Sequence, residues 1–330
     1  MSEISVLIAT HNGADLLRRT LEGYIALGPQ PFDWQVIVID NASTDDTPKV
    51  LEAFKDKLPL ITEYEPQPGK NRALNLGVKH ISAPRVILSD NDSIPHAGFL
   101  EKWVAAFDAA PETDVFGGSI TPWFDTPMPQ WMLDEKPRFI ELYALRENIP
   151  DGPIGADYIF GPNMAVRKKL FDDGLIFDED VGPNSSRSNY AMGSETAYCR
   201  AAESAGYKLG FASAPSVYHI VRPNQTTEAF REKRAYRLGL GTARKHWIEG
   251  AIKPHNPTGL RMVVRAGLRG MKKMAFLLSQ LLPNPAKRFD AAWNFHFYRG
   301  YQDGVDGLRQ QNAQDQRSSS LAVSASETAS

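Results

Sequence analysis

Two carboxylates, Asp90 and Asp92, stand one residue apart directly after an apolar run in the segment "PRVILSDNDSIPH" (84–96). One or two carboxylates commonly hold Mg²⁺ or Mn²⁺ in proteins, with phosphate oxygens completing the ligand shell. The same letters also fit the D-x-D-x-[ST] motif of phosphatases, in which the first Asp is a nucleophile, and a pair of capping acids in a turn. Spacing alone leaves these three interpretations open, although the position after a buried strand favours the cation.

Polar residues also follow two other apolar runs in the first half of the chain. Thr10 and Asn12 end the first run, and Asp40 to Ser43 end the second. Because ligands of open α/β sheets bind outside the carboxyl ends of the strands, we expect these residues to converge with Asp90 on one edge. Asn12 and Ser43 are equally well explained as helix caps or turn formers. Asp40 and Asp90 end apolar runs and need a partner, such as a base imide N–H or ribose hydroxyls.

The segment "PQPGKNRALNLGVKH" (66–80) places Gly69, Lys70, Asn71 and Arg72 at a predicted helix start. Helix N-termini with a glycine and basic side chains favour phosphate groups, and the alternative is a solvated helix start. The sequence contains no G-x-G-x-x-G and no G-x-x-x-x-G-K-[ST] motif. It therefore indicates neither a dinucleotide cofactor nor a P-loop.

Short apolar runs alternate with amphipathic helical patterns in the first 122 residues. The predicted strands are 5–10, 34–40, 60–65, 84–90 and 115–121. They are mostly apolar throughout, as strands of a buried parallel sheet are. The predicted helices lie around 16–25, 48–54, 71–81 and 99–107. Repeated βα units of this kind predict an α/β fold with a doubly wound, mainly parallel sheet flanked by helices.

The rest of the chain is predicted to hold a second half of this domain and a helical extension. Residues 123–192 are irregular and rich in Pro, Gly and aromatic residues, as is typical of a functional segment over a scaffold. The later predicted elements are a helix over 195–205, a strand over 208–213, a segment "PSVYHIV" over 215–221, and helices from 223 to about 308 with breaks near 254–257 and 283–285. The predicted domains are 1–221, with halves of about 1–122 and 123–221, a basic helical extension over 222–310, and a disordered tail over 311–330.

Seven ordered motifs resemble those of family 2 glycosyltransferases with the GT-A fold. They are "VLIATHNGADLLRRTL", "VIVIDNASTDDT", "PGKNRALNLGV", "RVILSDND", "GPNMAVRKKLF", "FDED" and "GYKLGFASAPSVYH". The resemblance covers residues 4 to about 221. It implies a nucleotide-sugar donor, a divalent cation (Mn²⁺ or Mg²⁺) and, as is usual in the family, inversion at the anomeric carbon. UDP is the family's commonest nucleotide, and GDP and dTDP stay open.

The resemblance assigns the donor site to the strand ends and the loops that follow them. Asp40 matches the acid that contacts the nucleotide base, Asp90 the carboxylate near the ribose, and Asp92 the metal ligand. His219 matches a histidine that often lies near the diphosphate or metal, although a lone histidine is more commonly structural. The further donor-binding residues that we assign are Thr10, Asn12, Arg72, Asn91, Gly161 and Asn163.

The segment "MGSETAYCRAAESAGYKL" resembles the family's "G-E-D-x-x-L…AGY" stretch, in which the Asp is the catalytic base. Alignment backwards from Cys199 and "AGY" (205–207) puts Glu195 at that position, with Ser194 replacing the preceding Glu. Glu is competent as a base, but its extra methylene moves the carboxylate. The alternative is a helix N-terminal carboxylate favoured by the helix dipole.

The function implied is a metal-dependent inverting glycosyltransferase of the hexosyltransferase type. It would transfer one sugar from a nucleoside-diphosphate sugar, UDP-sugar first, to a hydroxyl of a glycan or lipid-linked acceptor, in cell-surface polysaccharide or glycolipid synthesis. The Gln-x-x-Arg-Trp signature of processive relatives is missing, which favours one sugar per encounter. Two alternatives stay open: a haloacid-dehalogenase-like phosphatase using Asp90 and Asp92, and a non-catalytic sugar-nucleotide binding module. Three tryptophans could stack on sugar faces or simply pack: Trp123, Trp131 and Trp247.

Length and composition fit a chain of one large domain, or of a domain with an appendage, that buries a sizeable core. The 330 residues are 42% apolar, and the single cysteine, Cys199, excludes an internal disulfide and a thiolate zinc cluster. The start "MSEISVLIATHNG" lacks the basic region and apolar length of a signal peptide, so a cytoplasmic location is expected. The longest apolar runs fall short of the roughly 18–20 residues that span a bilayer.

The net charge of −2 is unevenly distributed, because residues 222–300 hold 16 Lys and Arg against four Asp and Glu. Within this region, Arg261, Arg265, Arg269, Lys272 and Lys273 recur at helical spacing. Another face of the same helix carries Leu260, Val264, Leu268, Met271, Ala275 and Leu278. Such a helix fits an anionic membrane surface, peripheral at the inner face of the plasma membrane, or packing on the core with a solvated basic face. Nucleic acid is a poorer candidate because no recognised binding motif is present.

Overall fold

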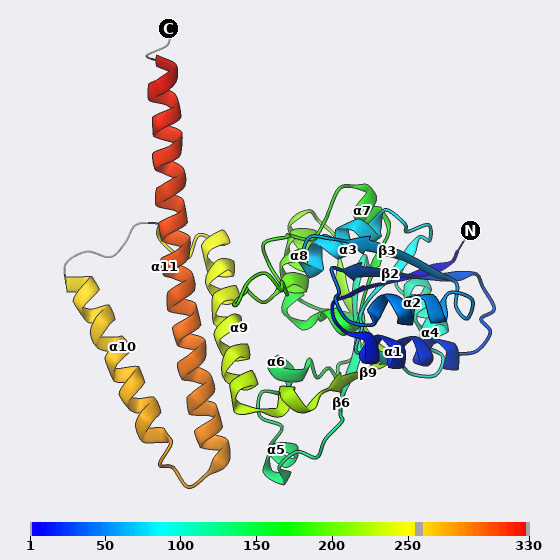
Figure 1. Cartoon of the computed structure of the whole chain (residues 1–330), viewed down its shortest axis with the longest axis horizontal. Helices are drawn as coiled ribbons and strands as arrows, with labels where there is room; N and C mark the ends of the chain where they lie inside the picture. The colour runs from blue at the N-terminus through cyan, green and yellow to red at the C-terminus, as the bar shows by residue number, and fades with distance from the viewer. Residues whose placement is uncertain (1, 255–259, 328–330) are drawn as a thin grey trace. The chain divides into compact units, whose positions relative to one another are not determined.

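The computed structural model describes residues 2–254 and 260–327 (Figure 1). It divides the chain into two compact units. The first unit consists of Met1–Met128, Arg138–Ser188 and Gly193–Thr226, and the second of Pro129–Pro137, Asn189–Met192 and Thr227–Ser330. Two short segments that the sequence analysis placed in the first domain therefore belong to the second unit.

The first unit is built on a mixed sheet whose N-terminal half is parallel. The strands of that half are β1 (Ile4–Thr10), β2 (Trp34–Asn41), β3 (Leu60–Glu65) and β4 (Arg85–Asp90). In the described part of the chain the strand order is β3-β2-β1-β4-β8-β6-β9-β5, and β7 pairs with β9. The later strands are β5 (Ser93–Pro95), β6 (Val115–Phe124), β7 (Gly152–Pro153), β8 (Met164–Arg167) and β9 (Leu209–Val221). The predicted α/β class with a mainly parallel sheet is confirmed.

Helices cover both faces of this sheet, because alternate residues of each strand are apolar on opposite sides (Figure 1). One face packs against α1 (Ala14–Ala26), α2 (Thr47–Phe54) and α4 (Phe99–Ala109). The other face packs against α3 (Lys70–Val78), α7 (Lys169–Asp172) and α8 (Ser194–Ser204). This two-sided burial explains why the strands read as continuous apolar runs.

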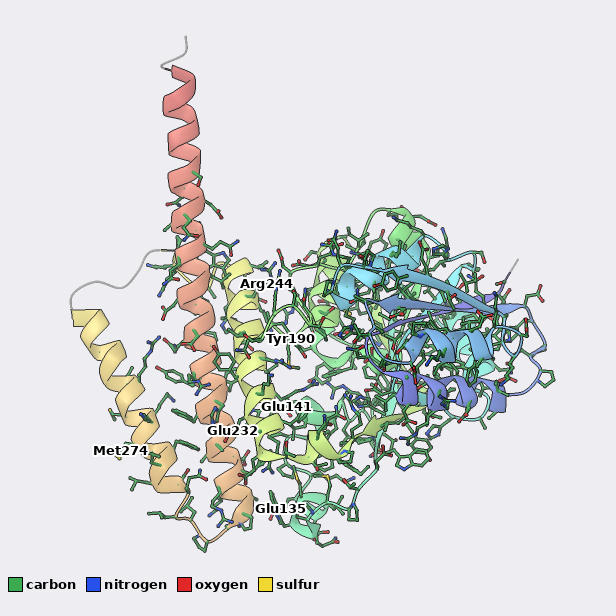
Figure 2. The ribbon with its side chains drawn as sticks, viewed as in Figure 1. Glu135, Glu141, Tyr190, Glu232, Arg244 and Met274 are labelled. Atoms are coloured by element: carbon green, nitrogen blue, oxygen red, sulfur yellow. The ribbon has the colours of Figure 1, made fainter. Side chains whose placement is uncertain are left out.

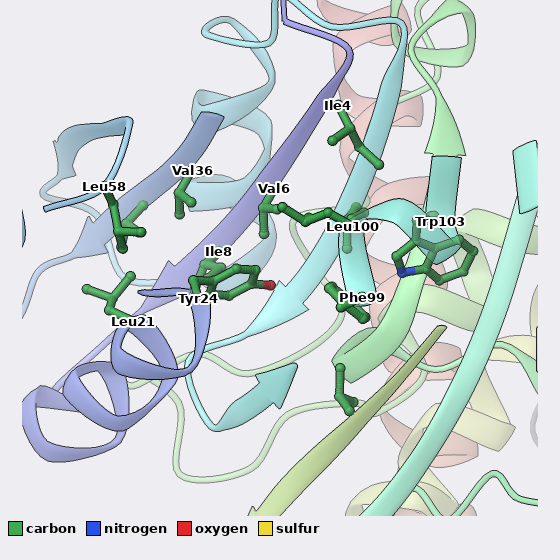
Figure 3. Close-up of a cluster of buried hydrophobic side chains, with 14 of the residues drawn as sticks. Ile4, Val6, Ile8, Leu21, Tyr24, Val36, Leu58, Phe99, Leu100 and Trp103 are labelled. Atoms are coloured by element: carbon green, nitrogen blue, oxygen red, sulfur yellow. The ribbon is translucent and has the colours of Figure 1, made fainter. Parts of the chain in front are cut away.

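Strand β1 illustrates the alternation. Val6 and Ile8 belong to the cluster under α1, α2 and α4, whereas Leu7 belongs to the cluster under α3 and α8. In the first cluster, Tyr24 of α1 and Trp103 of α4 are almost fully buried beside these strands (Figure 3). Burying a large apolar side chain stabilises the fold by about 1.5–3 kcal/mol. The cluster therefore fixes β1 and its neighbours in a rigid frame.

The irregular segment over 123–192 contains several short elements, of which one 3-10 turn carries the predicted site residues Gly161 and Asn163. They are α5 (Gln130–Glu135), α6 (Phe139–Tyr143), β7, the 3-10 turns η1 (Ala156–Tyr158) and η2 (Gly161–Asn163), β8 and α7. Strand β8 was not predicted, and it pairs antiparallel with both β4 and β6. The segments predicted separately at 208–213 and 215–221 form the single strand β9, and the 3-10 turn η3 (Pro223–Thr226) follows it. Insertion of β8 beside β4 brings η2 close to the end of β4.

The second unit contains three long helices, α9 (Glu228–Ile248), α10 (Leu260–Ser279) and α11 (Pro285–Glu327). The predicted break near 283–285 separates α10 from α11, whereas the break near 254–257 lies partly outside the described residues. The sequence analysis predicted disorder over 311–330, but α11 continues to Glu327. Ala and Gln make up seven of the 20 residues 311–330 and favour helix, which opposes the disorder expected from the Ser-rich composition.

Helices α9 and α11 approach closely through small residues. A methyl group on Gly300 would overlap the backbone carbonyl of Tyr236, and one on Gly239 would overlap the backbone of Phe297 and Tyr301. Gly304 lies against Ala243 one turn further along. Small residues four apart on each helix allow this backbone contact, as they do in tightly packed helix pairs generally.

Replacing Gly300 with Leu is expected to destabilise the second unit by about 1–3 kcal/mol or more, because the side chain has no space between the two backbones. The measurement is urea unfolding followed by circular dichroism. Gly307→Ala is the matched control on the same helix, because no heavy atom lies within 4 Å of its added methyl group. An unchanged midpoint for Gly300→Leu would show that the two helices do not pack in this way.

Candidate active site

The carboxyl edge of the parallel strands brings three of the predicted residues together. Thr10 pairs with Asp40 across β1 and β2, and Ala9 pairs with Asp90 across β1 and β4. The side chains of Thr10 and Asp40 are almost fully buried. The convergence expected from the strand ends is therefore present in the structure.

The loops after β1 and β2 hold each other through Asn12. Its backbone N–H donates to Ser43 Oγ at 2.9 Å, and its side-chain oxygen accepts from the Thr44 N–H at 2.7 Å. The Asp40 carboxylate accepts from the Ser43 N–H at 3.1 Å. Asn12 thus has a structural role in these loops, and its contact with a donor stays a prediction.

Asn41 is a residue of this edge that the sequence analysis did not select. Its side-chain oxygen accepts from the Gly69 N–H at 2.7 Å, and its amide donates to the carbonyls of Glu65 and Gln67. Gly69 has a φ of 149°, a conformation that favours glycine. Asn41 therefore fixes the path of the chain from β3 into α3. Its position at the end of the apolar run 34–40 was the feature of the sequence from which Asn41 could have been selected.

Lys70, at the start of α3, links two of the predicted carboxylates. Its Nζ lies 2.6 Å from Asp90 Oδ1 and 3.0 Å from Glu195 Oε1. All three side chains are largely buried. Burial alone would lower the pKa of Lys70, but the two carboxylates outweigh it and raise the pKa above its usual value. Lys70 is therefore a charged bridge between the end of β4 and the start of α8.

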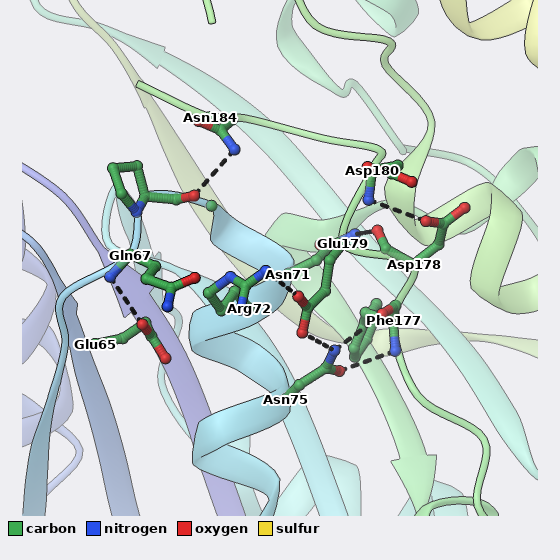
Figure 4. A network of polar contacts seen from close by, with 12 residues as sticks. Glu65, Gln67, Asn71, Arg72, Asn75, Phe177, Asp178, Glu179, Asp180 and Asn184 are labelled. Carbon is green, nitrogen blue, oxygen red and sulfur yellow. Dashed lines mark hydrogen bonds and ion pairs between the residues drawn. The ribbon is translucent and has the colours of Figure 1, made fainter. Parts of the chain in front are cut away.

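The N-terminal turns of α3 are also bound to the loop over 177–184 (Figure 4). Asn71 donates to the carbonyls of Asp178 and Val181, and the hydroxyl of Ser194 donates back to Asn71 at 2.6 Å. Asn75 exchanges two hydrogen bonds with the backbone of Phe177. This network connects α3 with the loop before α8, so it supports the position of Glu195.

Arg72 takes part in the same network. Its guanidinium forms an ion pair with Glu179 at 2.5 Å (Figure 4). The predicted contact between Arg72 and a nucleoside is not tested by this pairing. Both side chains are partly exposed, so the pair can rearrange around a ligand at low cost.

Gly161 lies directly against the predicted base. A methyl group at this position would overlap Oε1 of Glu195 and crowd its Cδ and Cγ atoms. The 3-10 turn η2, which carries Gly161, thus packs directly against the Glu195 carboxylate. A glycine here leaves the carboxylate in place beside Lys70.

Replacing Gly161 with Ala is expected to lower the turnover number by about 10–100-fold, because displacement of a reacting group by about 1 Å can cost this much. The KM for the donor should change little. Steady-state rates of donor hydrolysis or sugar transfer provide the measurement. Gly155→Ala in the same loop is the control, since no heavy atom lies within 4 Å of its added methyl group. Equal rates for Gly161→Ala and wild type would contradict the contact.

Asp92, two residues after Asp90, lies close to His219 of β9. His219 Nε2 lies 3.5 Å from Asp92 Oδ1, and its Nδ1 is 2.9 Å from the carbonyl of Tyr143, to which it can donate. Burial would raise the pKa of Asp92, but His219 and Arg222 outweigh it and hold the pKa below its usual value. Burial would likewise lower the pKa of His219, and Asp92 reverses that effect and raises it. The predicted pair of metal ligands is therefore adjacent and buried.

Asp92 and His219 offer one oxygen and one nitrogen atom of the kinds that bind divalent cations. Two ligands of one Mg²⁺ at about 2.0–2.1 Å lie about 2.9 Å apart in cis positions and about 4.1 Å apart in trans positions. The 3.5 Å between Asp92 Oδ1 and His219 Nε2 lies between these two values, so a shift of either side chain would bring both atoms onto one ion. Among the described residues no group of three or more His, Cys, Asp and Glu could hold a metal.

Two predicted donor contacts have mainly structural partners. The Asn91 amide donates to Thr10 Oγ1 at 2.8 Å and so ties β4 to β1. The side chain of Asn163 is fully buried, accepts from the Trp103 indole and donates to the carbonyls of Ser119 and Pro215. Its side-chain oxygen and amide both have partners within the chain, so Asn163 has a structural role here, and its contact with a donor stays a prediction.

The tryptophans proposed to stack on sugars differ in their surroundings. Trp123 is 45% exposed and packs edge-on against Tyr218. Trp131 packs against Phe289 within the second unit. Trp247 is partly buried. Trp123 is thus the one of the three with a clearly exposed ring.

Comparison with known proteins matches this architecture to one family. A family model described as glycosyl transferase family 2 matches residues 5–175. The glycosyltransferase AglE of Haloferax volcanii is 26% identical over 243 residues, covering 72% of this chain and 72% of AglE. The residues 5–175 that match the family model include the strand ends, Lys70, both residues of the D-x-D pair and Gly161.

Two solved structures share the fold. A structure of S. aureus TarS 1-349 in complex with UDP aligns with a TM-score of 0.51 at 16% identity, over 94% of this chain and 92% of TarS 1-349. The mannosyltransferase PcManGT of Pyrobaculum calidifontis, in complex with GDP-Man and Mn²⁺, aligns with a TM-score of 0.51 at 17% identity, over 100% of this chain and 81% of PcManGT. Both alignments extend beyond the strand-rich part of the chain into its helical end.

Proposed function

The chain belongs to glycosyl transferase family 2 and is a glycosyltransferase, and from this premise we propose that it transfers one sugar from a nucleoside-diphosphate sugar, UDP-sugar first, with inversion and with the help of Mn²⁺ or Mg²⁺. The acceptor would be a hydroxyl of a glycan or lipid-linked saccharide in cell-surface polysaccharide or glycolipid synthesis. Family membership leaves no support for the phosphatase interpretation of Asp90 and Asp92.

The observation that carries the proposal is the pairing of Glu195 with Lys70 beside Asp90. Lys70 holds one oxygen of the Glu195 carboxylate at 3.0 Å, next to the edge where nucleosides bind in open sheets. In the proposed reaction Glu195 accepts the proton of the acceptor hydroxyl. The acceptor oxygen bonds to the anomeric carbon as the bond from that carbon to the phosphate oxygen breaks, and the nucleoside diphosphate leaves with the bonding electrons.

The residues around this centre have distinct proposed roles. Asp40 and Thr10 would contact the nucleoside base, Asp90 the ribose, and Arg72 the same pocket. Asp92 and His219 would hold the cation, which offsets negative charge on the departing diphosphate when it is bound. GDP-Man and Mn²⁺ bound to PcManGT, and UDP bound to TarS, support a nucleotide-sugar donor and a divalent cation for this fold.

We also propose that the enzyme works at the inner face of the plasma membrane. The support is the excess of Lys and Arg over residues 222–300, which would favour an anionic lipid surface. A lipid-linked acceptor would be presented there. Among the described residues, the structure offers no helix of sufficient length and apolar character to cross a bilayer.

The donor class is tested by thermal-shift screening against UDP-, GDP- and dTDP-sugars, each with and without Mn²⁺. We expect stabilisation that requires one nucleotide and the cation together. A phosphomonoester serves as the negative control. If no nucleotide sugar stabilises the protein under any of these conditions, the proposal fails.

A further inference from the structure

The described contacts between α10 and α11 lie on one side of α10. The rings of Phe276 and Phe295 stack with centroids 4.6 Å apart, and Arg269 forms an ion pair with Asp306 at 2.7 Å. Lys272 Nζ lies 4.6 Å from the centre of the Tyr298 ring. Residues 269, 272 and 276 follow helical spacing, so they define the face of α10 that packs.

The opposite face of α10 is apolar and exposed. Met271 is 69% exposed, Met274 58% and Leu278 60%, and Met274 lies on the side of α10 away from α11 (Figure 2). The remaining large apolar side chains exposed on α10 and just beyond its end are Val264, Leu268, Leu277, Leu281 and Leu282. Single apolar residues on a surface are ordinary, but this row of eight exposed large apolar side chains between residues 264 and 282 indicates a binding surface.

The charge of α10 indicates what covers this row. Its 20 residues, Leu260–Ser279, include five Lys and Arg and no Asp or Glu. A second copy of α10 docked on this face would bring together two helices that each carry five Lys and Arg and no acid, which opposes self-association. An anionic surface would instead be attracted to this net positive charge. Arg269 and Lys272 contact α11, whereas the exposed Lys273 can extend its stem to lipid headgroups.

We propose that α10 lies flat in the interface of an anionic bilayer, with the row from Val264 to Leu282 entering the boundary between headgroups and acyl chains. The inference rests on the proposed function, because a lipid-linked acceptor would explain why this enzyme needs a lipid surface. It goes further by assigning membrane binding to apolar insertion of one helix rather than to basic charge alone.

The test is cosedimentation of the full chain with phosphatidylcholine vesicles that contain, or lack, about 30% phosphatidylserine. Wild type should bind the anionic vesicles. Met271→Asn combined with Leu278→Asn keeps the charge and removes two inserted side chains, so we expect binding to fall at least about tenfold. Lys273→Gln should lower binding by only about fivefold. Ile248→Asn, which changes a 70% exposed apolar residue of α9, is the control and should bind as wild type.

A second measurement does not depend on removing binding. A polarity-sensitive fluorophore on Met271→Cys should shift to shorter wavelength with anionic vesicles, whereas the same label on Ile248→Cys should not. The native Cys199 is buried and will not compete for the label. The row is solvent-exposed, so the substitutions should leave the circular dichroism spectrum unchanged.

Several results would overturn the inference. They are equal vesicle binding by wild type and the double Asn variant, an equal loss with Ile248→Asn, or a concentration-dependent dimer in light scattering that the double variant abolishes. The nucleotide-sugar thermal shift is measured on the same samples. If that shift persists while the vesicle result fails, only the membrane inference falls, and loss of the shift in wild type would instead remove the proposed function.

Discussion

Replacing Glu195 with Gln is expected to lower kcat by about 10³-fold, within the range observed when a general base is removed. Gln has the shape of Glu and can still accept a hydrogen bond from Lys70, but it cannot take a proton from the acceptor hydroxyl. The KM for the donor should stay within a few-fold, because the assigned nucleoside contacts lie at the strand ends. The measurement is steady-state sugar transfer, or donor hydrolysis where no acceptor is at hand.

Glu203→Gln provides the matched control for this substitution. Glu203 lies on the same helix, α8, and its side chain is exposed. It should retain wild-type kcat and KM. If Glu195→Gln turned over at the wild-type rate, Glu195 would not be the base, and the alignment that selected it would be in the wrong register.

The distance between Lys70 and Glu195 also bears on the replacement of the family's Asp by Glu. A Glu carboxylate sits one methylene further from the backbone than an Asp carboxylate and samples more rotamers. Here Oε1 is held by Lys70 at 3.0 Å, and Gly161 lies against the same oxygen and the carbons Cδ and Cγ of Glu195. Two fixed neighbours limit the rotamers of Glu195, so a longer side chain can still present its carboxylate in one place.

Strand ends could be predicted from the sequence because their signal is local. Runs such as "SVLIAT" and "WQVIVID" are apolar over both faces, and the polar residues after them fall on the carboxyl edge of any parallel sheet. Thr10, Asp40 and Asp90 were found in this way. The adjacency of Asp92 and His219 was expected from the family resemblance, since 127 residues separate them in the chain.

Side-chain partners across long separations could not be predicted. Lys70 was assigned to phosphate binding from its place at a helix start, and 125 residues separate it from Glu195, which the structure places beside it. Asn163 was assigned to the donor from the resemblance of its loop to the family's donor-sugar stretch, and the structure places its side chain in η2, buried beside Trp103. In both cases the deciding information is the packing of β8 and α8 against the sheet, which no local pattern encodes.

Replacing Asp92 with Asn is expected to weaken Mn²⁺ binding by at least about 10–100-fold, the range that changes around metal ligands commonly produce. The amide keeps the volume of the carboxylate but removes the negative charge that sits 3.5 Å from His219. Because the diphosphate would then leave without a well-held cation, kcat/KM should fall by about 10²–10³-fold, which is several kcal/mol of charge stabilisation. Calorimetric titration of Mn²⁺ in the presence of a nucleoside diphosphate measures binding independently of turnover.

The exposed Asp56, which follows α2, offers a matched control because Asp56→Asn makes the same chemical change outside the site. It should leave Mn²⁺ affinity and rate unchanged. If Asp92→Asn loses Mn²⁺ affinity while the contacts to the donor base stay intact, the two carboxylates of the D-x-D pair have different roles. Asp90, which pairs with Lys70 at 2.6 Å, would then position the centre from the ribose side, while Asp92 alone holds the cation from this strand end. Unchanged Mn²⁺ binding in Asp92→Asn would contradict this division and remove Asp92 from the cation site.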